Sequence, residues 1–207
     1  MNSHPGVTRF AVDFVILPPE HVADTAISLN KQVCNKSYIA LDKDQCLPHV
    51  SLLMGCLRLD QIRQAELILK AIASHHNVMS LRVPDIRTVN TSAGDIMTLN
   101  IEPHNGLQTL HESLVDAFTS LLAKNANDDD VFGDSPVAPS TLDWINNYIS
   151  DSCVENFWPH ITVGYVKENT VVGDIKPFTF AASRIAICHL GNYCTCKKVL
   201  TEIRLAE

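Results

Sequence analysis

The sequence predicts an α+β fold with two antiparallel-sheet lobes and flanking helices around a central cleft. Strand-like apolar segments alternate with amphipathic helical segments along the chain. One short phrase occurs twice, as PHVSL at 48–52 and as PHITV at 159–163. The 207 residues with 46% hydrophobic content suffice for a substantial core. We therefore expect residues 1–207 to form one domain of two lobes, with one copy of the phrase in each lobe.

The first half of the chain predicts two helices among several strands. Residues 10–17 (FAVDFVIL) are typical of a buried strand, which Pro18 and Pro19 end. A helix then opens at Pro19 or Glu20, and the first histidine strand covers about 49–57. Asp60 is the expected N-cap of the next helix. Strand-like segments follow at 78–83, 86–89 and 96–101, with a hairpin turn at 93–95.

The second half predicts two more helices and the second histidine strand. Asn105 with Gln108 has the spacing of a capping box for a helix that runs to about 121. Residues 125–139 contain an acidic run and are interpreted as a solvated, mobile loop. Ser140 with Asp143 is expected to cap a short helix. The second histidine strand covers about 160–166, and closing strands follow at 178–180, 184–190 and 198–205.

The repeated phrase indicates two matched sites on two strands. Because side chains i and i+2 of a strand point to the same face, His49 lies beside Ser51 and His160 beside Thr162. A histidine followed two places later by Ser or Thr is weak evidence by itself, since His111 also has this spacing inside a helical pattern. The proline before His49 and before His160 separates these two from His111.

Composition excludes several functional classes. The net charge of −7 argues against a broad surface for duplex nucleic acid, which needs a basic stripe. No apolar run approaches membrane-spanning length, and the first residues lack the pattern of a signal peptide. We therefore expect a monomeric cytoplasmic protein whose substrate is a small or short anion held by a few local donors.

Seven scattered cysteines, an odd number in a chain of this length, make a disulfide framework unexpected. Cys188, His189, Cys194 and Cys196 form the tightest group of metal-ligand types. Their spacing is not the usual Cys-x2-Cys of a zinc hairpin, so the sequence favours reduced structural thiols and no metal.

These motifs resemble those of the 2H phosphoesterase superfamily, above all its 2′-5′ RNA ligases, also called RNA 2′,3′-cyclic phosphodiesterases. The apolar strand ending in Leu17-Pro18-Pro19 is similar to the opening strand of that group. The resemblance implies that His49 and His160 are the catalytic pair and that Ser51 and Thr162 hold the phosphate. It also implies that the ligand is a small nucleotide or a short RNA end and that neither metal nor cofactor is needed. One departure is the missing basic residue directly after the second motif, where Lys167 is the nearest cation.

Two histidines suit the hydrolysis of a 2′,3′-cyclic or 2′-5′ phosphodiester, because one can act as base and the other as acid near neutral pH. In reverse, the same pair would form a 2′-5′ linkage. A nucleobase also needs a stacking surface, for which the candidates are Phe14, Phe157, Trp158 and Tyr193. Three alternatives stay open: an ADP-ribose cyclic phosphate phosphodiesterase, a nucleotide-binding module without turnover, and a metal-dependent hydrolase.

Overall fold

The computed structural model describes residues 8–33, 38–91, 94–133, 136–166 and 175–207. Its helices are α1 (Glu20–Val33), α2 (Ile62–Ala73), α3 (Asn105–Phe118) and α4 (Pro139–Asp151). Its strands are β1 (Arg9–Ile16), β2 (Val50–Arg58), β3 (Met79–Val83), β4 (Ile86–Thr91), β5 (Gly94–Asn100), β6 (His160–Tyr165), β7 (Phe178–Ala182), β8 (Arg184–Gly191) and β9 (Thr195–Arg204).

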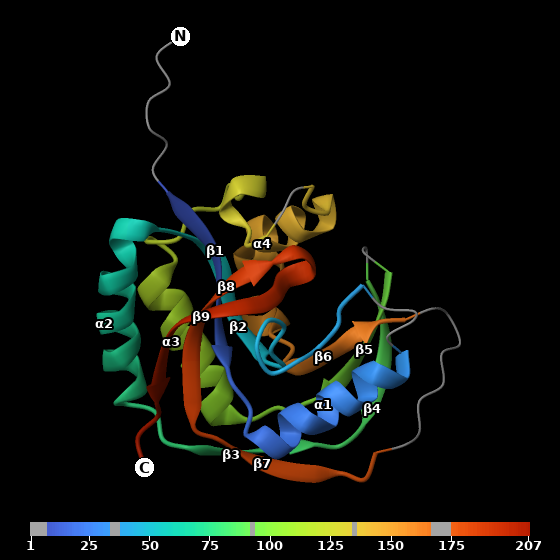
Figure 1. Ribbon diagram of the computed structural model, residues 1–207. Helices are drawn as coiled ribbons and strands as arrows, with labels where there is room; N and C mark the ends of the chain where they lie inside the picture. Colours follow the sequence, from blue (N-terminus) through green and yellow to red (C-terminus); the bar gives the residue numbers. More distant parts are fainter. Residues whose placement is uncertain (1–7, 34–37, 92–93, 134–135, 167–174) are drawn as a thin grey trace.

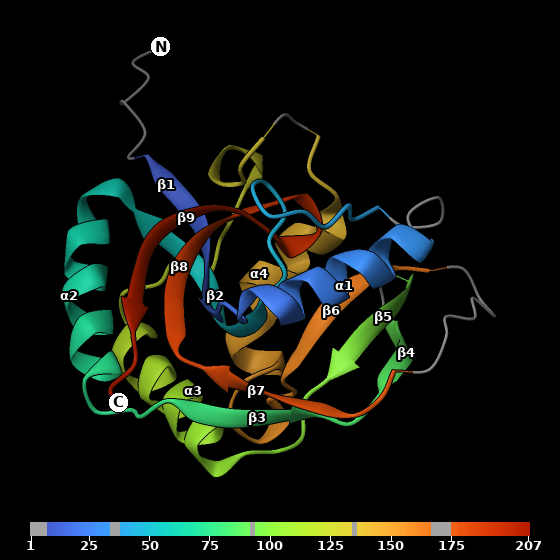
Figure 2. The same ribbon diagram turned by 60° about the horizontal axis from the view of Figure 1, so that its bottom comes forward.

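Seven of the strands form one sheet in the order β4-β5-β6-β2-β1-β8-β9. All of its strand pairs are antiparallel, and β2 meets β6 at the single register pair Val50–Ile161. The sheet thus has two halves, β4-β5-β6 and β2-β1-β8-β9, joined where the two histidine strands touch. β3 and β7 form a separate two-stranded sheet, which runs along the lower edge in Figure 2. The predicted α+β class is confirmed.

The helices cover the sheet from different sides. α2 and α3 lie side by side at the left of Figure 1, where α2 contacts β9 and α3 contacts β2. α1 packs on β6, and α4 packs on β2. In the core between β1 and α3, the rings of Phe14 and Phe118 lie 4.3 Å apart. Both histidine strands are therefore held from behind by helices.

Three predicted helix caps are wrong, those of α2, α3 and α4. Asp60 lies within a 3-10 helix (Leu59–Gln61) that precedes α2, and its carboxylate pairs with Arg58 at 2.6 Å instead of capping α2. The N-cap of α3 is His104, whose Nδ1 accepts a hydrogen bond from the N–H of Leu107 at 3.3 Å. The imidazole of His104 takes the capping role expected of Asn105, because Asn105 is already the first residue of the helix and His104 is the N-cap.

α4 also begins differently from the prediction. Its N-cap is Ala138, and Pro139 occupies the first turn, so Ser140 and Asp143 do not form the expected cap. Proline is well suited to this place because its missing N–H has no partner inside the helix anyway. The predicted helix itself is present and extends to Asp151.

The acidic run is more ordered than expected. Asp128–Asp130 form a 3-10 helix, and Asp130 is only 4% exposed. Both carboxylate oxygens of Asp130 bind the Arg9 guanidinium, at 3.1 and 2.7 Å. The expectation of a fully solvated loop is wrong for Asp130, because the ion pair fastens this segment to β1. Residues 134–135 of the predicted loop lie outside the described residues.

The cysteines differ from the sequence expectation in one respect. Cys188 and Cys196 form a disulfide across the β8–β9 pair. Cys46, Cys56 and Cys153 are free and buried. Within the described ranges, no group of three or more His, Cys, Asp or Glu side chains is arranged to hold a metal ion.

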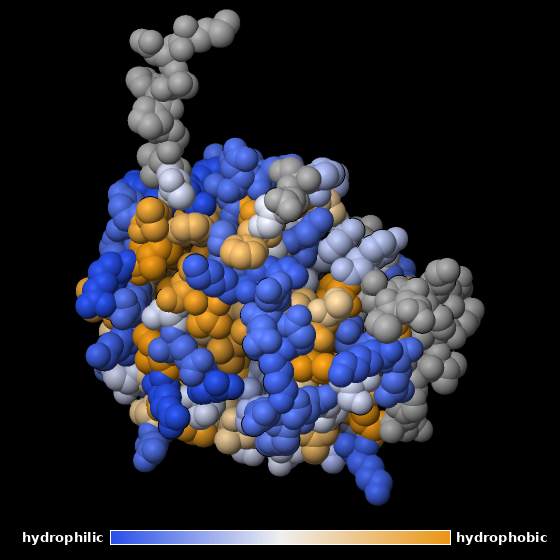
Figure 3. All heavy atoms as spheres, in the orientation of Figure 1, coloured by the Kyte–Doolittle hydropathy of each residue, from blue (hydrophilic) through white to orange (hydrophobic). Residues whose placement is uncertain are grey.

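The surface is chemically mixed. Figure 3 shows hydrophilic side chains over most of one face, with hydrophobic ones between them. No helix in the described part of the chain is long and apolar enough to cross a membrane.

Candidate active site

A pocket of about 330 Å³ opens at the junction of the two half-sheets. His49, directly before β2, and Ser51 of β2 line it together with His160 and Thr162 of β6. The structure thus brings together the four residues that the repeated phrase singled out. The volume is at the lower end of the range for small-molecule sites.

Each histidine is held by a carbonyl two residues earlier. His49 Nδ1 lies 2.8 Å from the carbonyl oxygen of Leu47, and His160 Nδ1 lies 2.9 Å from that of Trp158. A carbonyl only accepts, so both Nδ1 atoms carry the proton, and each neutral ring has its lone pair on Nε2. Leu47 and Trp158 each precede a proline, which restricts their backbone to extended conformations. The prolines of the phrase therefore help to fix the imidazole tautomer.

A bulge follows the motif on β2. Ser51 is the register partner of Val15 on β1, but Leu53 is the partner of Phe14, so Leu52 is an extra residue. The bulge changes which side chains share a face. As a result this segment lines the pocket with His49, directly before β2, and with Ser51 and Met54 of β2.

The same bulge occurs on β6. Thr162 pairs with Thr98 of β5, but Gly164 pairs with Met97, so Val163 is the extra residue. The pocket is lined from β6 by His160, Thr162 and Tyr165. The spacing of the lining residues equals that on β2. The internal likeness therefore extends beyond the sequence phrase to strand geometry.

Buried side chains from two helices satisfy the bulge carbonyls. His111 of α3 donates from Nδ1 to the carbonyl of Leu52 at 2.7 Å, and Asn30 of α1 donates to the carbonyl of Val163 at 2.7 Å. Bulged residues lose ladder bonds, and buried carbonyls left unpaired are costly. His111, which also has the His-x-Ser spacing, thus lies behind the site and not among the pocket-lining residues.

Both pocket histidines favour the neutral form. Burial lowers the pKa of His49, against the opposing effect of its bond to the Leu47 carbonyl. The pKa of His160 is lowered to about 4, chiefly by burial and to a lesser extent by the nearby His49, against the opposing effect of its bond to the Trp158 carbonyl. His49 is therefore close enough to disfavour protonation of His160. In the free protein both Nε2 lone pairs are available at neutral pH.

Of the four predicted stacking residues, two line the pocket. Trp158 stacks on the His160 ring at 4.1 Å, and Tyr193 lies on the 3-10 helix Asn192–Cys194. Phe14 is completely buried in the core, so the prediction that it contacts a base is wrong. Phe157 does not line the pocket, because it stacks on His111 at 4.1 Å. Apolar sequence context could not separate core aromatics from pocket aromatics.

Sequence reasoning missed further pocket aromatics. Trp144 and Tyr148 reach the pocket from α4, and Tyr165 reaches it from the bulged end of β6. Trp144 is 43% exposed. Trp144 lies between the buried residues Thr141 and Ile145 of α4, at the edge of the apolar face of the helix. A large aromatic side chain at such a position indicates a contact surface, and this pattern could have found it.

Asp13 was also missed, although it is the single charged residue in the apolar run 10–17. Its side chain is completely buried on β1. Ser51 Oγ lies 2.6 Å from Asp13 Oδ2, and His49 Nε2 lies 3.7 Å from the same oxygen. A buried acid behind two pocket residues is the kind of group that sets protonation states.

The pocket contains little positive charge. No lysine or arginine of the described ranges lines it, whereas Asp151 does. Lys197 lies near Cys46 and Asp42 and is not a lining residue. Lys167 lies outside the described residues. Hydroxyls and amide groups, together with an imidazole that gains a proton on Nε2, are thus the donors that this part of the chain offers to an anion.

Comparison with known proteins identifies the class. The family model described as "2'-5' RNA ligase superfamily" matches residues 18–187. The chain belongs to this superfamily of 2H phosphoesterases. The comparison with curated protein sequences gives no significant match.

Solved structures of the same class share the fold. TT0787 of Thermus thermophilus superposes with a TM-score of 0.60 at 15% identity, over 94% of this chain and 97% of that one. E. coli LigT complexed with 3′-AMP gives a TM-score of 0.60 at 15% identity, over 96% and 99%. LigT complexed with NADP+ gives 0.56 at 15% identity, over 96% and 99%.

Proposed function

We propose that the protein is a metal-independent phosphodiesterase that hydrolyses a 2′,3′-cyclic or 2′-5′ phosphodiester of RNA or of a nucleotide. The observation that carries this proposal is the matched pair of histidines, each with a hydroxyl two residues later, in one pocket at the β2–β6 junction. Membership of the 2′-5′ RNA ligase superfamily supports the reaction class. Under this proposal residues 1–207 work as one domain of two lobes.

His49 and His160 act as the proton-transfer groups. One Nε2 takes a proton from the attacking water, and the other, protonated, gives a proton to the leaving ribose oxygen. These atoms lie on opposite sides of phosphorus in an in-line displacement, which suits two imidazoles that come from different half-sheets. Since both pKa values are lowered in the free protein, the acid must gain its proton when the anionic substrate binds.

Ser51 and Thr162 hold the non-bridging oxygens. A hydroxyl donates a hydrogen bond without titrating, and donors placed where charge develops stabilise the transition state. With no lysine or arginine among the described lining residues, the pocket suits a phosphodiester with one negative charge better than a phosphomonoester with two. That preference favours release of the hydrolysed product.

Trp144, Trp158 and Tyr193 are the proposed contacts of the nucleoside part, because stacking accepts any base. The partner is then a small nucleotide or a short RNA end, bound by a monomer. 3′-AMP and NADP+ in the LigT structures are ligands of this size.

The test is a turnover assay in EDTA with 2′,3′-cyclic nucleotides, 2′-5′ oligoadenylate and ADP-ribose cyclic phosphate, with products resolved by chromatography. His49→Ala and His160→Ala should each lower the rate by about 10²- to 10⁴-fold. His21→Ala, at an exposed histidine of α1, is the matched control and should keep the wild-type rate. Full activity of both pocket variants would refute the two-histidine mechanism.

The same assay separates the alternatives. Preferential turnover of ADP-ribose cyclic phosphate would assign that substrate to the site. Tight nucleotide binding without turnover would indicate a binding module of the same fold. Complete loss of activity in EDTA would indicate a metal-dependent hydrolase.

A further inference from the structure

The two halves of the site differ at one equivalent position. Beyond the bulge on β2, the register partner of Met54 is Asp13 on β1. Beyond the bulge on β6, the register partner of Tyr165 is Ile96 on β5. Asp13 and Ile96 thus occupy matching places beside the two motifs, and Ile96 also lines the pocket. Because an apolar residue occupies the equivalent place on β5, strand pairing does not explain why β1 has an acid there.

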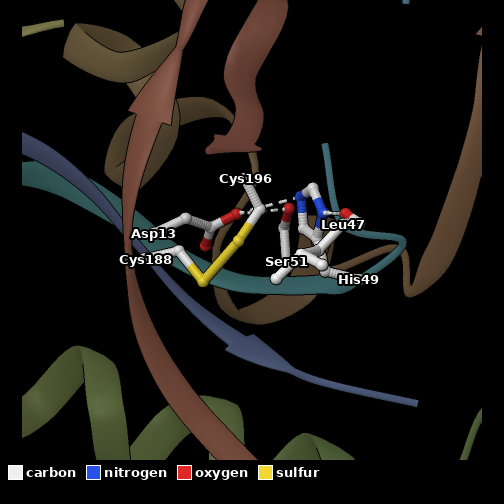
Figure 4. The surroundings of a disulfide bond; sticks show 6 residues. All are labelled: Asp13, Leu47, His49, Ser51, Cys188 and Cys196. Carbon is white, nitrogen blue, oxygen red and sulfur yellow. Dashed lines mark hydrogen bonds and ion pairs between the residues drawn. A yellow bond between two sulfur atoms is a disulfide. The ribbon is translucent and has the colours of Figure 1, made fainter. Parts of the chain in front are cut away.

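The surroundings of Asp13 are almost entirely uncharged. Figure 4 shows its carboxyl directed toward Ser51 and His49, with the Cys188–Cys196 disulfide alongside. Cys188 is its register partner on β8. His49 is the one basic side chain within 4 Å among the described residues.

The other titratable neighbours are Tyr148 of α4 and Cys194 of the 3-10 helix Asn192–Cys194. Burial raises the pKa of each, so both stay neutral. Asp13 Oδ1 has no hydrogen-bond partner in the described part of the chain. Full burial, an unpartnered oxygen and the lack of a nearby permanent cation all oppose ionisation of this carboxyl.

The proton count at Ser51 makes the state of Asp13 important. A serine hydroxyl has one proton. If Asp13 is ionised, it can only accept, so the proton of Ser51 is used in the 2.6 Å bond to Oδ2 and is not available to a phosphate oxygen. If Asp13 is neutral, its own proton can occupy that bond, and Ser51 accepts it.

We propose that Asp13 is a positioning residue held in its neutral form, which donates the Oδ2 proton to Ser51 Oγ and thereby frees the Ser51 proton for a phosphate oxygen. This inference rests on the proposed function. Burial raises the pKa of Asp13 well above its ordinary value, against the effects of Ser51 and of the backbone N–H groups of Leu53 and Leu52. His49 at 3.7 Å is beyond hydrogen-bond distance and is itself shifted toward neutrality, so the two do not form an ion pair in the free protein.

Two substitutions of Asp13 separate this role from a structural one. Asp13→Asn keeps the size, is always neutral and offers N–H donors to Ser51. Asp13→Val removes the donor and the unpartnered oxygen together. With 2′,3′-cyclic AMP as substrate, we expect kcat/KM to fall by about 10- to 100-fold in Asp13→Val, the loss of a hydrogen bond to a charged group. Asp13→Asn should restore it to within about threefold of wild type.

A double-mutant cycle tests whether Asp13 acts through Ser51. In a Ser51→Ala background, Asp13→Val should cause no further loss, because the hydroxyl that it orients is absent. A further loss of the same size as in the wild-type background would overturn the proposal. An Asp13→Asn variant that is as impaired as Asp13→Val would also overturn it. That result would indicate that Asp13 acts as an ionised partner of protonated His49, a role that the neutral Asn side chain cannot take.

An infrared measurement gives a readout that is independent of turnover. Wild-type protein at neutral pH should show the C=O stretching band of a protonated carboxylic acid, and Asp13→Val should lack it. If the wild-type spectrum has no such carboxylic acid band that Asp13→Val lacks, Asp13 is ionised and the proposal is wrong. If the protein turns over no diester, the proposed function is wrong. The infrared band still decides whether Asp13 is protonated.

Discussion

Val50 and Ile161 are register partners across the antiparallel pair of β2 and β6, and each directly follows one of the two histidines. An antiparallel pair brings residue i−1 of one strand toward residue j+1 of the other. His49 thus lies on the side of Thr162, and His160 on the side of Ser51. Each phosphate-binding candidate is next to both imidazoles, one on its own strand and one across the junction.

The lowered pKa values of the two buried histidines predict an acidic rate optimum. The general acid must be protonated, and its pKa in the free protein is lowered by burial, to about 4 for His160. kcat/KM should therefore rise as pH falls from 8 toward 6, and should fall again once the base is protonated. The profile of kcat should be shifted to higher pH, because the bound phosphate raises both pKa values. Initial rates from pH 4 to 9 measure this, and a kcat/KM that peaks above pH 8 would contradict it.

The pocket aromatics predict a selective loss of binding. Stacking of a base on an aromatic ring contributes about 1–3 kcal/mol. Trp144→Ala should therefore raise KM for 2′,3′-cyclic AMP by roughly 5- to 150-fold. Phe157→Leu is the control, since Phe157 packs on His111 outside the pocket lining. Equal KM values for Trp144→Ala and wild type would exclude Trp144 as a base contact.

The sequence was most informative where neighbouring residues alone determine the local structure. The apolar run of β1, the proline-histidine phrases and the helical spacing of α1 were all predicted within one or two residues. The bulges at Leu52 and Val163 were not predictable, because an extra residue in a strand leaves the local alternation unmarked and is defined only by the partner strand. The inclusion of Tyr165 and the exclusion of Phe14 both depend on such tertiary pairing.

The disulfide predicts a redox-dependent stability. Cys188 and Cys196 are eight positions apart, so in the chain-entropy model their bond stabilises the fold by about 2–3 kcal/mol. Reduction by dithiothreitol should lower the urea midpoint correspondingly. Cys188→Ala/Cys196→Ala should match the reduced protein and no longer respond to dithiothreitol. An intact mass after alkylation without reductant that shows both thiols modified would contradict the bond.

Asn30 predicts a coupling between stability and the site. Its side chain is 2% exposed and makes three bonds, donating to the carbonyls of Ile39 and Val163 at 2.7 Å each and accepting from the N–H of Leu41 at 3.0 Å. Asn30→Leu would remove these three bonds, and the loss of a hydrogen bond to a buried backbone group costs about 1–3 kcal/mol. We expect the free energy of unfolding to fall by about 3 kcal/mol or more.

The matched control for Asn30 is Asn147→Leu, at an exposed asparagine of α4 whose amide donates to the carbonyl of Asp143 in the same helix. This variant should lie within about 0.5 kcal/mol of wild type in urea unfolding. Similar losses in the two variants would mean that the bulge at Val163 does not depend on Asn30.

His111 predicts a loss of stability in acid. Its Nδ1 donates to the Leu52 carbonyl at 2.7 Å, and its Nε2 accepts from the N–H of Val154 at 2.8 Å, an arrangement that only the neutral ring can make. Burial lowers its pKa in the folded protein. The unfolded chain therefore binds more protons below about pH 6.5, so stability is full above that value and falls as pH decreases.

A His111→Phe variant separates this titration from that of the other histidines. The ring can still stack on Phe157, but the Leu52 carbonyl and the Val154 N–H lose their partner, so stability at pH 7.5 should fall by about 2–3 kcal/mol. The further loss of unfolding free energy between pH 7.5 and 5.5 should be smaller than in wild type, because the variant lacks one histidine whose pKa is lowered by folding. Urea unfolding at both pH values measures this, with the exposed His75→Ala as control. An unchanged pH dependence in His111→Phe would show that the ring does not titrate with unfolding.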